Sequence, residues 1–341
     1  MMGINSKNIL YIGNNLTSKT KYATTIDTLS SLLNLEGYTV LKTSSKLNKL
    51  ARLADMCLTL IKSRRKIEYV LIDTFSTSNF YFALLTSQLA RIFKIRYIPI
   101  LHGGNLPFRL DRSNFLSKLI FINSYVNVAP SNYLKNEFEK RGFNTIFIPN
   151  TLEIEKYKYQ DRENMLPKIL WVRAFKHLYN PLMAIKVLAK VKEEFEEAEL
   201  CMIGPVLDVS FNETKALANK LNLNNSIQFT GVLSKEEWHK KAKEYALFIN
   251  TTNIDNTPVS VMEAMALGLT IVSTNAGGMP YLIEDNYDGV LVDKNDHIMM
   301  ANSIIKILKE NNRELSKKAR IKAESFGWDV VKHQWKSLLN N

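Results

Sequence analysis

The chain lacks most of the features that mark specialised protein classes. Only two cysteines, Cys57 and Cys201, occur in 341 residues. They lie far apart in apolar surroundings, so we expect buried reduced thiols rather than a disulfide or a metal site. No apolar run reaches the roughly 18 residues that a membrane-spanning helix needs. Glycine and proline number 13 and 9, which is too few for a fibrous or low-complexity chain.

Motifs of several well-known chemistries are also missing. The sequence has no Asp-x-Asp for a nucleotide-bound metal, no closely spaced pair of His or Cys, no Gly-x-Gly-x-x-Gly, no Walker loop and no Gly-x-Ser-x-Gly. Metal, dinucleotide, ATPase and serine-hydrolase functions therefore lose support. The first residues, 1–7, lead into a predicted strand rather than a signal-peptide core, so we expect a cytoplasmic protein.

Positive charge is concentrated in the first half of the chain. Residues 1–160 hold 22 Lys and Arg against 10 Asp and Glu, whereas residues 161–341 hold 23 of each. The whole net charge of +12 therefore lies in the first half. Such asymmetry indicates an anionic partner, which is a phospholipid surface, a nucleic acid or a phosphorylated acceptor. The alternative is a lysine-rich surface that only serves solubility.

Short apolar runs alternate with helical periodicity along the chain. The predicted strands are 9–12, 38–41, 69–72, 97–101, 126–129, 146–148, 169–172, 200–203, 227–229, 247–250, 269–273 and 290–292. The predicted helices are 18–35, 46–65, 78–94, 112–122, 131–141, 181–195, 212–221, 235–244, 258–267, 296–310, 314–325 and 328–339. The polar segment from Pro149 to Pro167 is predicted to be a linker. This alternation indicates α/β domains with parallel sheets covered on both faces.

The length exceeds what one hydrophobic core usually supports. We predict a doubly wound domain over residues 1–160, a second one over residues 161–325, and a final segment, 326–341. Ligands of such open sheets lie beyond the carboxyl ends of the strands, so a cleft between the two domains is the predicted active site.

One predicted helix has a start suited to binding phosphate. Thr257 followed by Pro258 predicts a helix N-terminus, because a threonine oxygen caps free amides and proline is favoured at the first helical position. The amides of Val259 and Ser260 then point outward at the positive end of the helix dipole.

Two carboxylates and two glycines accompany this helix. Asp255 precedes it, and Glu263 lies about 8 Å along the axis from the helix start, roughly the span from a sugar through a diphosphate to a ribose. The predicted strand 269–273 leads to Gly277 and Gly278. The alternative interpretation is an ordinary buried helix and strand with two incidental carboxylates.

The spacing of Asp255 and Glu263 resembles the Glu-x7-Glu signature of family 4 glycosyltransferases. Asp255 stands where that family has a glutamate, and Tyr281 follows Gly277-Gly278-Met279-Pro280 where a further glutamate is usual. The resemblance covers several separated segments. It implies a GT-B fold, in which two Rossmann-like domains face each other across a cleft and the last helix crosses back to the first domain. It also implies retaining sugar transfer without a metal, and no cofactor beyond the nucleotide-sugar substrate.

The resemblance assigns roles to individual residues. Arg173, at the end of a predicted strand, would grip the donor diphosphate, and its guanidinium suits that contact. Lys176 would replace a family lysine whose position is occupied by Tyr179-Asn180-Pro181, or it is a solvated loop residue. Glu263 would accept from the ribose hydroxyls.

Two further residues are expected at the donor sugar and the phosphates. His102 precedes Gly103-Gly104 and resembles the family's first-domain loop, so with Asp255 it would orient the sugar, donating to a hydroxyl. Gly13 follows the first strand and is a weak signal for a phosphate loop.

Two basic segments of the first half are candidates for acceptor or membrane contact. Residues 46–66 predict an amphipathic helix with Leu47, Leu50, Leu53, Ala54, Cys57, Leu58 and Ile61 on one face. Such a helix either lies on anionic lipid or packs its apolar stripe on the sheet. Its nearby basic residues are Lys46, Lys49 and Arg52. A second patch contains Arg109 and Arg112.

We therefore predict a retaining, metal-independent hexosyltransferase that moves a sugar to a lipid-linked or growing polysaccharide acceptor. It would serve cell-surface polysaccharide biosynthesis, in the cytoplasm or peripherally on the inner face of the membrane, with an acceptor-binding first domain and a donor-binding second domain. No nucleic-acid-binding motif is present, so no nucleic acid is expected as a partner. The alternatives are a sugar-nucleotide epimerase or hydrolase of the same fold, and a non-catalytic membrane- or nucleic-acid-binding protein.

Overall fold

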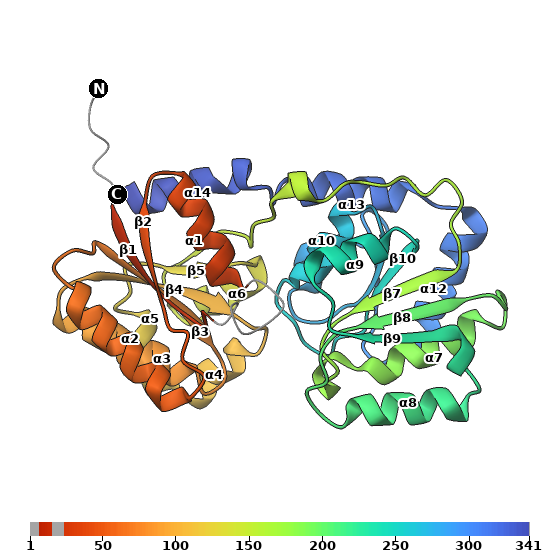
Figure 1. The fold of residues 1–341 in the computed structure, drawn as a ribbon, viewed down its shortest axis with the longest axis horizontal. Coiled ribbons are helices and arrows are strands. Elements are labelled where there is room, and N and C mark those ends of the chain that lie inside the picture. Colours follow the sequence, from red (N-terminus) through yellow and green to blue (C-terminus); the bar gives the residue numbers. More distant parts are fainter. Residues whose placement is uncertain (1–6, 16–23, 341) are drawn as a thin grey trace. The chain divides into compact units, whose positions relative to one another are not determined.

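The computed structural model describes residues 7–15 and 24–340. The chain forms two compact units (Figure 1). Unit 1 contains the residues up to Thr151 together with those from Trp328 onward, and unit 2 contains Leu152–Gly327. The division falls after Thr151 rather than after residue 160, and the C-terminal helix belongs to the first unit.

Unit 1 is built on a six-stranded parallel sheet in the order β2-β1-β3-β4-β5-β6. The strands are β1 (Asn8–Ile12), β2 (Thr39–Thr43), β3 (Tyr69–Phe75), β4 (Arg96–His102), β5 (Asn127–Ala129) and β6 (Thr145–Phe147). The helices are α1 (Thr25–Leu35), α2 (Lys49–Ser63), α3 (Phe80–Ile92), α4 (Leu106–Arg112), α5 (Asn114–Phe121), α6 (Asn132–Glu139) and α14 (Trp328–Asn340). The first part of the helix predicted at 18–35 lies outside the described residues.

The two faces of this sheet are covered by different helices, because successive strand side chains point to opposite faces. Helices α1 and α14 cover one face, where Trp328 and Trp335 pack among the aliphatic residues of β1, β3 and β4. Helices α2 to α6 cover the other face. The predicted helix 112–122 corresponds to α5, and the short helix α4, which was not predicted, precedes it and ends at Ser113.

Unit 2 contains a second six-stranded parallel sheet, in the order β12-β11-β10-β7-β8-β9. The strands are β7 (Lys168–Val172), β8 (Glu199–Ile203), β9 (Ile227–Gly231), β10 (Leu247–Asn250), β11 (Thr270–Thr274) and β12 (Val290–Val292). The α-helices are α7 (Pro181–Val191), α8 (Ser210–Lys220), α9 (Lys235–Ala242), α10 (Val259–Ala266), α11 (Met279–Leu282), α12 (His297–Glu310) and α13 (Glu314–Glu324). Short 3-10 helices are η2 (Ile154–Lys156), η3 (His177–Tyr179) and η4 (Asn224–Ser226).

Both faces of the second sheet are also covered. Helices α7, α8 and α12 pack on one face and α9, α10, α11 and α13 on the other. The predicted pair of doubly wound parallel α/β domains is therefore confirmed. Within the described residues, no helix is long and apolar enough to cross a membrane. Cys57 and Cys201 are both free thiols.

The prediction of a linker before Pro167 is wrong for residues from Leu152 onward. The Leu152 amide donates to the Phe326 carbonyl (2.9 Å), and Tyr157 is buried in the core of unit 2. Arg162 reaches into the same unit with its guanidinium. It donates to the carbonyls of Tyr245, Gln160, Leu267, Gly268 and Ala242. A polar sequence pattern cannot distinguish an arginine that binds buried carbonyls, as Arg162 does, from one that is solvated.

Arg162 should therefore be a strong stabilising residue of unit 2. Replacement by methionine keeps the aliphatic stem but leaves several carbonyls without a donor. We expect Arg162→Met to lower the free energy of unfolding by about 2–4 kcal/mol, measured by urea denaturation. The control is Arg313→Met, because Arg313 makes only a half-exposed ion pair with Asp161 at 3.4 Å and should contribute less than about 1 kcal/mol. Equal effects of the two substitutions would contradict the role of Arg162.

Candidate active site

The topology of unit 2 marks one position of its sheet as a site for ligands. The chain proceeds from β7 to β8 and β9 on one side and then returns to β10, β11 and β12 on the other side. The strand order thus reverses between β7 and β10. Open α/β sheets bind ligands beyond the carboxyl ends of the strands at such a point. Arg173 follows β7 and residues 251–258 follow β10, so both segments reach this position.

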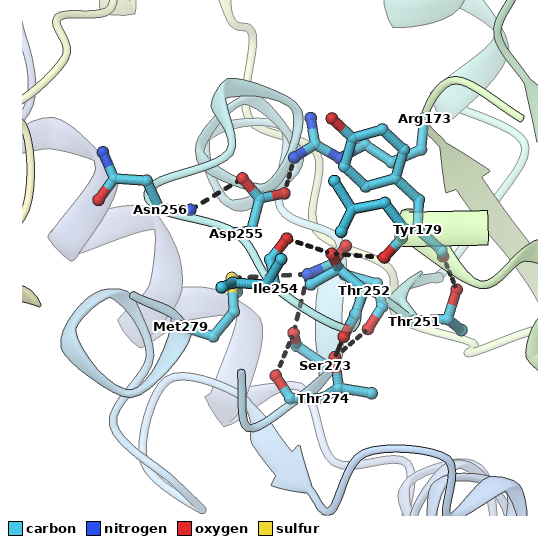
Figure 2. A network of polar contacts seen from close by, with 12 residues as sticks. Arg173, Tyr179, Thr251, Thr252, Ile254, Asp255, Asn256, Ser273, Thr274 and Met279 are labelled. Atoms are coloured by element: carbon cyan, nitrogen blue, oxygen red, sulfur yellow. Dashed lines mark hydrogen bonds and ion pairs between the residues drawn. The ribbon is translucent and has the colours of Figure 1, made fainter. Parts of the chain in front are cut away.

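An ion pair joins the two segments. The Arg173 guanidinium contacts the Asp255 carboxylate, and both side chains are largely buried. The ring of Tyr179 lies 4.5 Å from the guanidinium carbon, so the cation is covered on one side by an aromatic face (Figure 2). Burial lowers the pKa of Arg173. Among the described residues, Nε of Arg173 has no hydrogen-bond partner, so the guanidinium retains an unused donor.

Hydroxyl groups hold the segment after β10 in place. Thr274 Oγ1 donates to the Thr252 carbonyl (2.6 Å), and Thr252 Oγ1 donates to the Ile254 carbonyl (3.0 Å). Thr251 Oγ1 donates to the Tyr179 carbonyl (2.8 Å). These bonds tie the segment to the loop after β7 and to the end of β11 (Figure 2), so the backbone that carries Asp255 is well anchored.

Gly277 and Gly278 allow the loop after β11 to approach the backbone next to Asp255. A Cβ on Gly277 would lie 2.2 Å from the Asp255 carbonyl oxygen, and one on Gly278 would lie 2.0 Å from the Asn256 carbonyl oxygen. The Gly278 amide donates to the Asp255 carbonyl (3.0 Å). Gly277 and Gly278 therefore lie directly against the backbone of the loop that carries Asp255, as the sequence suggested.

Helix α10 begins one residue later than predicted. Pro258 occupies the N-cap position in an extended conformation and contributes no side-chain cap, so the prediction that Thr257 caps this helix is wrong. The Pro258 carbonyl accepts from the amides of Val261 and Met262. In the part of the chain that the structure describes, the amides of Val259 and Ser260 have no partner, and Ser260 Oγ is buried without one. The helix start therefore offers donors.

Glu263 is buried inside α10 with only 4% of its surface exposed. Its Oε1 accepts from Tyr157 Oη (2.8 Å) and from Lys235 Nζ (2.8 Å). Burial and the Glu263 carboxylate raise the pKa of Tyr157, so the phenol keeps its proton and donates. The ring of His239 packs on that of Tyr157 with ring centres 4.7 Å apart. Burial lowers the pKa of His239. Within the described residues, the contacts of Glu263 with Tyr157 and Lys235 are both made by Oε1, and none by Oε2.

Neither partner of Glu263 was expected from the sequence. Tyr157 lies in the segment interpreted as a linker. Lys235 begins α9, directly after Ser234, which with Glu237 forms a capping box. The predicted helix 235–244 already had Lys235 at its start, but no local pattern indicated its contact with Glu263. Lys176 is exposed on the loop before η3 and makes no ion pair within the described residues.

His102 and Gly13 lie in unit 1. His102 ends β4, and its Nε2 is 2.8 Å from Asp73 Oδ1. Tyr11 Oη donates to the same oxygen (2.9 Å). A Cβ on Gly13 would lie 2.3 Å from Asp73 Oδ2, so Gly13 leaves room for the carboxylate. Tyr11 and Asp73 were not expected from the sequence, although an aspartate that follows the apolar run Val70-Leu71-Ile72 is a usable signal.

The basic residues predicted to meet an acceptor or membrane differ in their environment. Lys46, Lys49 and Arg112 are exposed. Arg109 is half-buried, with its guanidinium carbon 4.5 Å from the ring centre of Phe80.

Arg52 departs from the expected surface position, because it is only 7% exposed. Its guanidinium donates to the carbonyls of Lys46 and Leu47 and to Asn14 Oδ1. Its role is therefore to join the start of α2 to the loop after β1.

The predicted apolar stripe of α2 is only partly buried. Arg52, Met56 and Leu60 face the core, whereas Leu50 is 79% exposed and Leu47 and Leu58 are also exposed. No group of three or more His, Cys, Asp or Glu side chains is placed to hold a metal ion in residues 7–15 and 24–340.

The sequence of unit 2 matches a known family. The model of the family described as "Glycosyl transferases group 1" matches residues 153–326, about half of the chain. The protein belongs to the group 1 glycosyltransferases.

Several relatives and solved structures resemble this glycosyltransferase. An uncharacterized glycosyltransferase of Haemophilus influenzae is 26% identical over 60% of this chain and 57% of its own length. The GalNAc-alpha-(1->4)-GalNAc-alpha-(1->3)-diNAcBac-PP-undecaprenol alpha-1,4-N-acetyl-D-galactosaminyltransferase of Campylobacter jejuni is 24% identical over 52% of this chain and 48% of its own. The chain thus spans about half the length of these curated relatives.

Solved structures agree in fold over nearly the whole chain. Anabaena HepE in complex with UDP-glucose has a TM-score of 0.77 at 15% identity and covers 98% of this chain and 99% of its own. Sucrose-phosphate synthase from Thermosynechococcus elongatus has a TM-score of 0.80 at 14% identity, with 98% of each chain covered. The glycosyltransferase has the GT-B fold.

The close approach at Gly278 provides a test of the site geometry. The φ of Gly278 is −82°, so alanine meets no backbone penalty and only the contact with the Asn256 carbonyl. We expect Gly278→Ala to lower the free energy of unfolding by about 2–3 kcal/mol, measured by thermal denaturation. Gly142→Ala is the control, since nothing lies within 4 Å of its Cβ position and only its positive φ adds a cost of about 1 kcal/mol. A smaller effect at Gly278 than at Gly142 would contradict the described packing.

Proposed function

We propose that this protein is a retaining, metal-independent glycosyltransferase that moves a hexose from a nucleotide-sugar to a lipid-linked or growing polysaccharide acceptor. The observation that carries the proposal is the arrangement at the strand reversal of unit 2. There the largely buried Arg173, which follows β7, pairs with Asp255, and the segment after β10 that carries Asp255 continues into the open amides at the start of α10 and the buried carboxylate of Glu263.

Each part of a nucleotide-sugar donor has a matching group in this arrangement. Amide donors and a positive dipole end at the start of α10 favour the diphosphate, and Arg173 adds a cation with an unused Nε donor. Glu263 offers Oε2 to a ribose hydroxyl, and Asp255 faces the sugar. The UDP and UDP-glucose complexes of HepE, a neighbour of the same fold, make uridine nucleotides suitable first probes. GDP-mannose is another, because a relative in Mycobacterium tuberculosis is named as GDP-mannose-dependent.

The proposed chemistry relies on charge stabilisation. When the bond from the sugar to the diphosphate breaks, negative charge develops on the leaving phosphate. Preorganised amides and Arg173 would stabilise that charge without reorganising. The two carboxylates do not act as a glycosidase acid and base in this proposal, because Asp255 pairs with Arg173 and Glu263 is held by Lys235 and Tyr157. Relatives named for alpha linkages support retention.

Loss of either donor-binding group should weaken binding of the nucleotide alone. We expect Glu263→Gln and Arg173→Ala each to reduce the affinity for the preferred nucleoside diphosphate by about 1.5–3 kcal/mol, the range for hydrogen bonds to charged groups. Isothermal titration with UDP, GDP, UDP-glucose and GDP-mannose measures it. The titrations contain excess EDTA, because the proposal invokes no metal.

Matched controls separate binding from folding. Glu244→Gln and Arg313→Ala change surface ion pairs of the same unit and should leave affinity unchanged. Circular dichroism confirms that each variant is folded. Affinities equal to the wild type in both site variants, for every probe that binds, would refute the donor-site assignment.

The acceptor side of the proposal rests on unit 1. The excess positive charge lies in residues 1–160, and α2 exposes leucines beside exposed lysines. Relatives whose names include undecaprenol and phosphatidylinositol acceptors support a lipid-linked acceptor. A lipid anchored in an anionic membrane would be met by this basic and apolar surface. A peripheral position on the inner face of the cell membrane is therefore part of the proposal.

Electrostatic docking should be reversible and sensitive to salt. We expect co-sedimentation with vesicles containing anionic phospholipid, little with neutral vesicles, and release as ionic strength rises, because each basic residue contributes about 1 kcal/mol within a Debye length of ~8 Å. Reversal of Lys46, Lys49 and Arg65 to glutamate should weaken sedimentation and preserve nucleotide affinity.

The matched control reverses three exposed lysines of unit 2, Lys220, Lys294 and Lys306. This variant has the same net charge change and should still sediment with anionic vesicles. An equal loss in both variants would show a general charge effect without a docking surface. Binding to neither type of vesicle would favour a soluble acceptor.

A further inference from the structure

Three polar side chains of unit 1 share one face of its sheet near the carboxyl ends of the strands. In the parallel register Tyr11 pairs with Leu71, and Phe75 pairs with His102. Because side chains alternate along a strand, Leu71, Asp73 and Phe75 lie on the same face, and so do Tyr11 and His102. The pleat therefore places the phenol, the carboxylate and the imidazole together.

The hydrogen bonds among these groups determine which imidazole nitrogen carries the proton. Asp73 Oδ1 is 2.8 Å from His102 Nε2 and 2.9 Å from Tyr11 Oη. Burial and the Asp73 carboxylate raise the pKa of Tyr11, so the phenol stays protonated and donates. A carboxylate only accepts, and Nε2 of the histidine must therefore be the donor to Asp73. In the neutral ring, Nδ1 is then an acceptor.

The surrounding packing fixes the ring as well as its proton. Phe75 stacks on the imidazole with ring centres 4.9 Å apart. Gly13 lies against the other carboxylate oxygen, where a side chain would displace Asp73. The imidazole side chain is 11% exposed, and within residues 7–15 and 24–340 Nδ1 has no hydrogen-bond partner. One nitrogen is thus held, and the other is left for a ligand.

We propose that Asp73 is a positioning residue that holds His102 in its Nε2–H tautomer, so that Nδ1 accepts a hydrogen bond from a sugar hydroxyl. This rests on the proposed glycosyltransferase function. It also reverses the polarity expected from the sequence, where the histidine was assigned as a donor. Tyr11 supports the arrangement by occupying the same carboxylate oxygen, which keeps Asp73 aimed at the ring.

Nitrogen NMR tests the tautomer without any substrate. The chain has five histidines, so 15N-histidine labelling gives a small set of signals, and His102→Gln identifies the one that belongs to His102. At mildly alkaline pH, where imidazoles are neutral, we expect an exchange-protected proton on Nε2 and an unprotonated Nδ1. Asp73→Ala should abolish that protection. A proton on Nδ1 in the wild type, or unprotected exchange at Nε2, would overturn the proposal.

Substitutions at Asp73 separate the acceptor role from the charge. An asparagine oxygen in the Oδ1 position can still accept both hydrogen bonds, whereas alanine cannot. We expect Asp73→Ala to reduce kcat at least about ten-fold, with Asp73→Asn recovering most of it. Turnover is measured as nucleoside diphosphate release from whichever of UDP-glucose or GDP-mannose the wild type uses. If Asp73→Asn is as impaired as Asp73→Ala, negative charge and not positioning is what matters, and the proposal fails.

Controls keep the result specific. Tyr11→Phe removes one of the two donors that hold Asp73 Oδ1, so we expect it to weaken the protection of the Nε2 proton and to lower kcat, in both cases less than Asp73→Ala. Glu139→Gln removes a surface carboxylate of unit 1 that forms an ion pair with Lys135, and it should change nothing. Affinity for UDP or GDP should stay within about two-fold in all variants, because the donor groups belong to unit 2. If the wild type binds no nucleotide-sugar, the proposed function fails, while the NMR result still decides the tautomer.

Discussion

Parallel strand pairing is the constraint on which the rest of this structure depends. Every strand pair in the described residues is parallel, so each strand must be followed by a crossover before the next one can pair. All carboxyl ends of one sheet then fall on a single edge, and residues distant in sequence meet there. Arg173 and Asp255 come together for this reason, as do Tyr11, Asp73 and His102.

The three carboxylates assigned to the candidate sites already have protein partners without a ligand. Asp255 pairs with Arg173, Glu263 accepts from Lys235 and Tyr157, and Asp73 accepts from Tyr11 and His102. Buried charges are tolerated only when they are paired and hydrogen-bonded. These partners occupy some oxygen and nitrogen atoms and leave others available. The pairing that makes burial of the charges possible therefore also determines which atoms can bind a substrate.

Much of this could be predicted from the sequence. Helices and strands follow from hydrophobic periodicity, and Arg173, Glu263 and the glycine pair stand out because strand ends, helix starts and Gly-Gly turns are local signals. Pairings between distant residues carry no such signal. Lys235 and Tyr157 reach Glu263 only through the folded chain, and Asp73 reaches His102 through sheet register. Arg52 was predicted to be exposed because it is charged. In the structure its guanidinium is buried, because it donates to the carbonyls of Lys46 and Leu47 just before α2.

The path of the chain gives unit 2 the character of an insertion. The chain enters at Leu152 and leaves at Gly327, and these two residues form a parallel bridge reinforced by the bond from the Leu152 amide to the Phe326 carbonyl (2.9 Å). Unit 1, in turn, is completed only by α14, which is made after all of unit 2. During synthesis on the ribosome, the core on one face of the first sheet therefore lacks Trp328 and Trp335 until all of unit 2 has been made. Unit 2 is the part that can finish folding first.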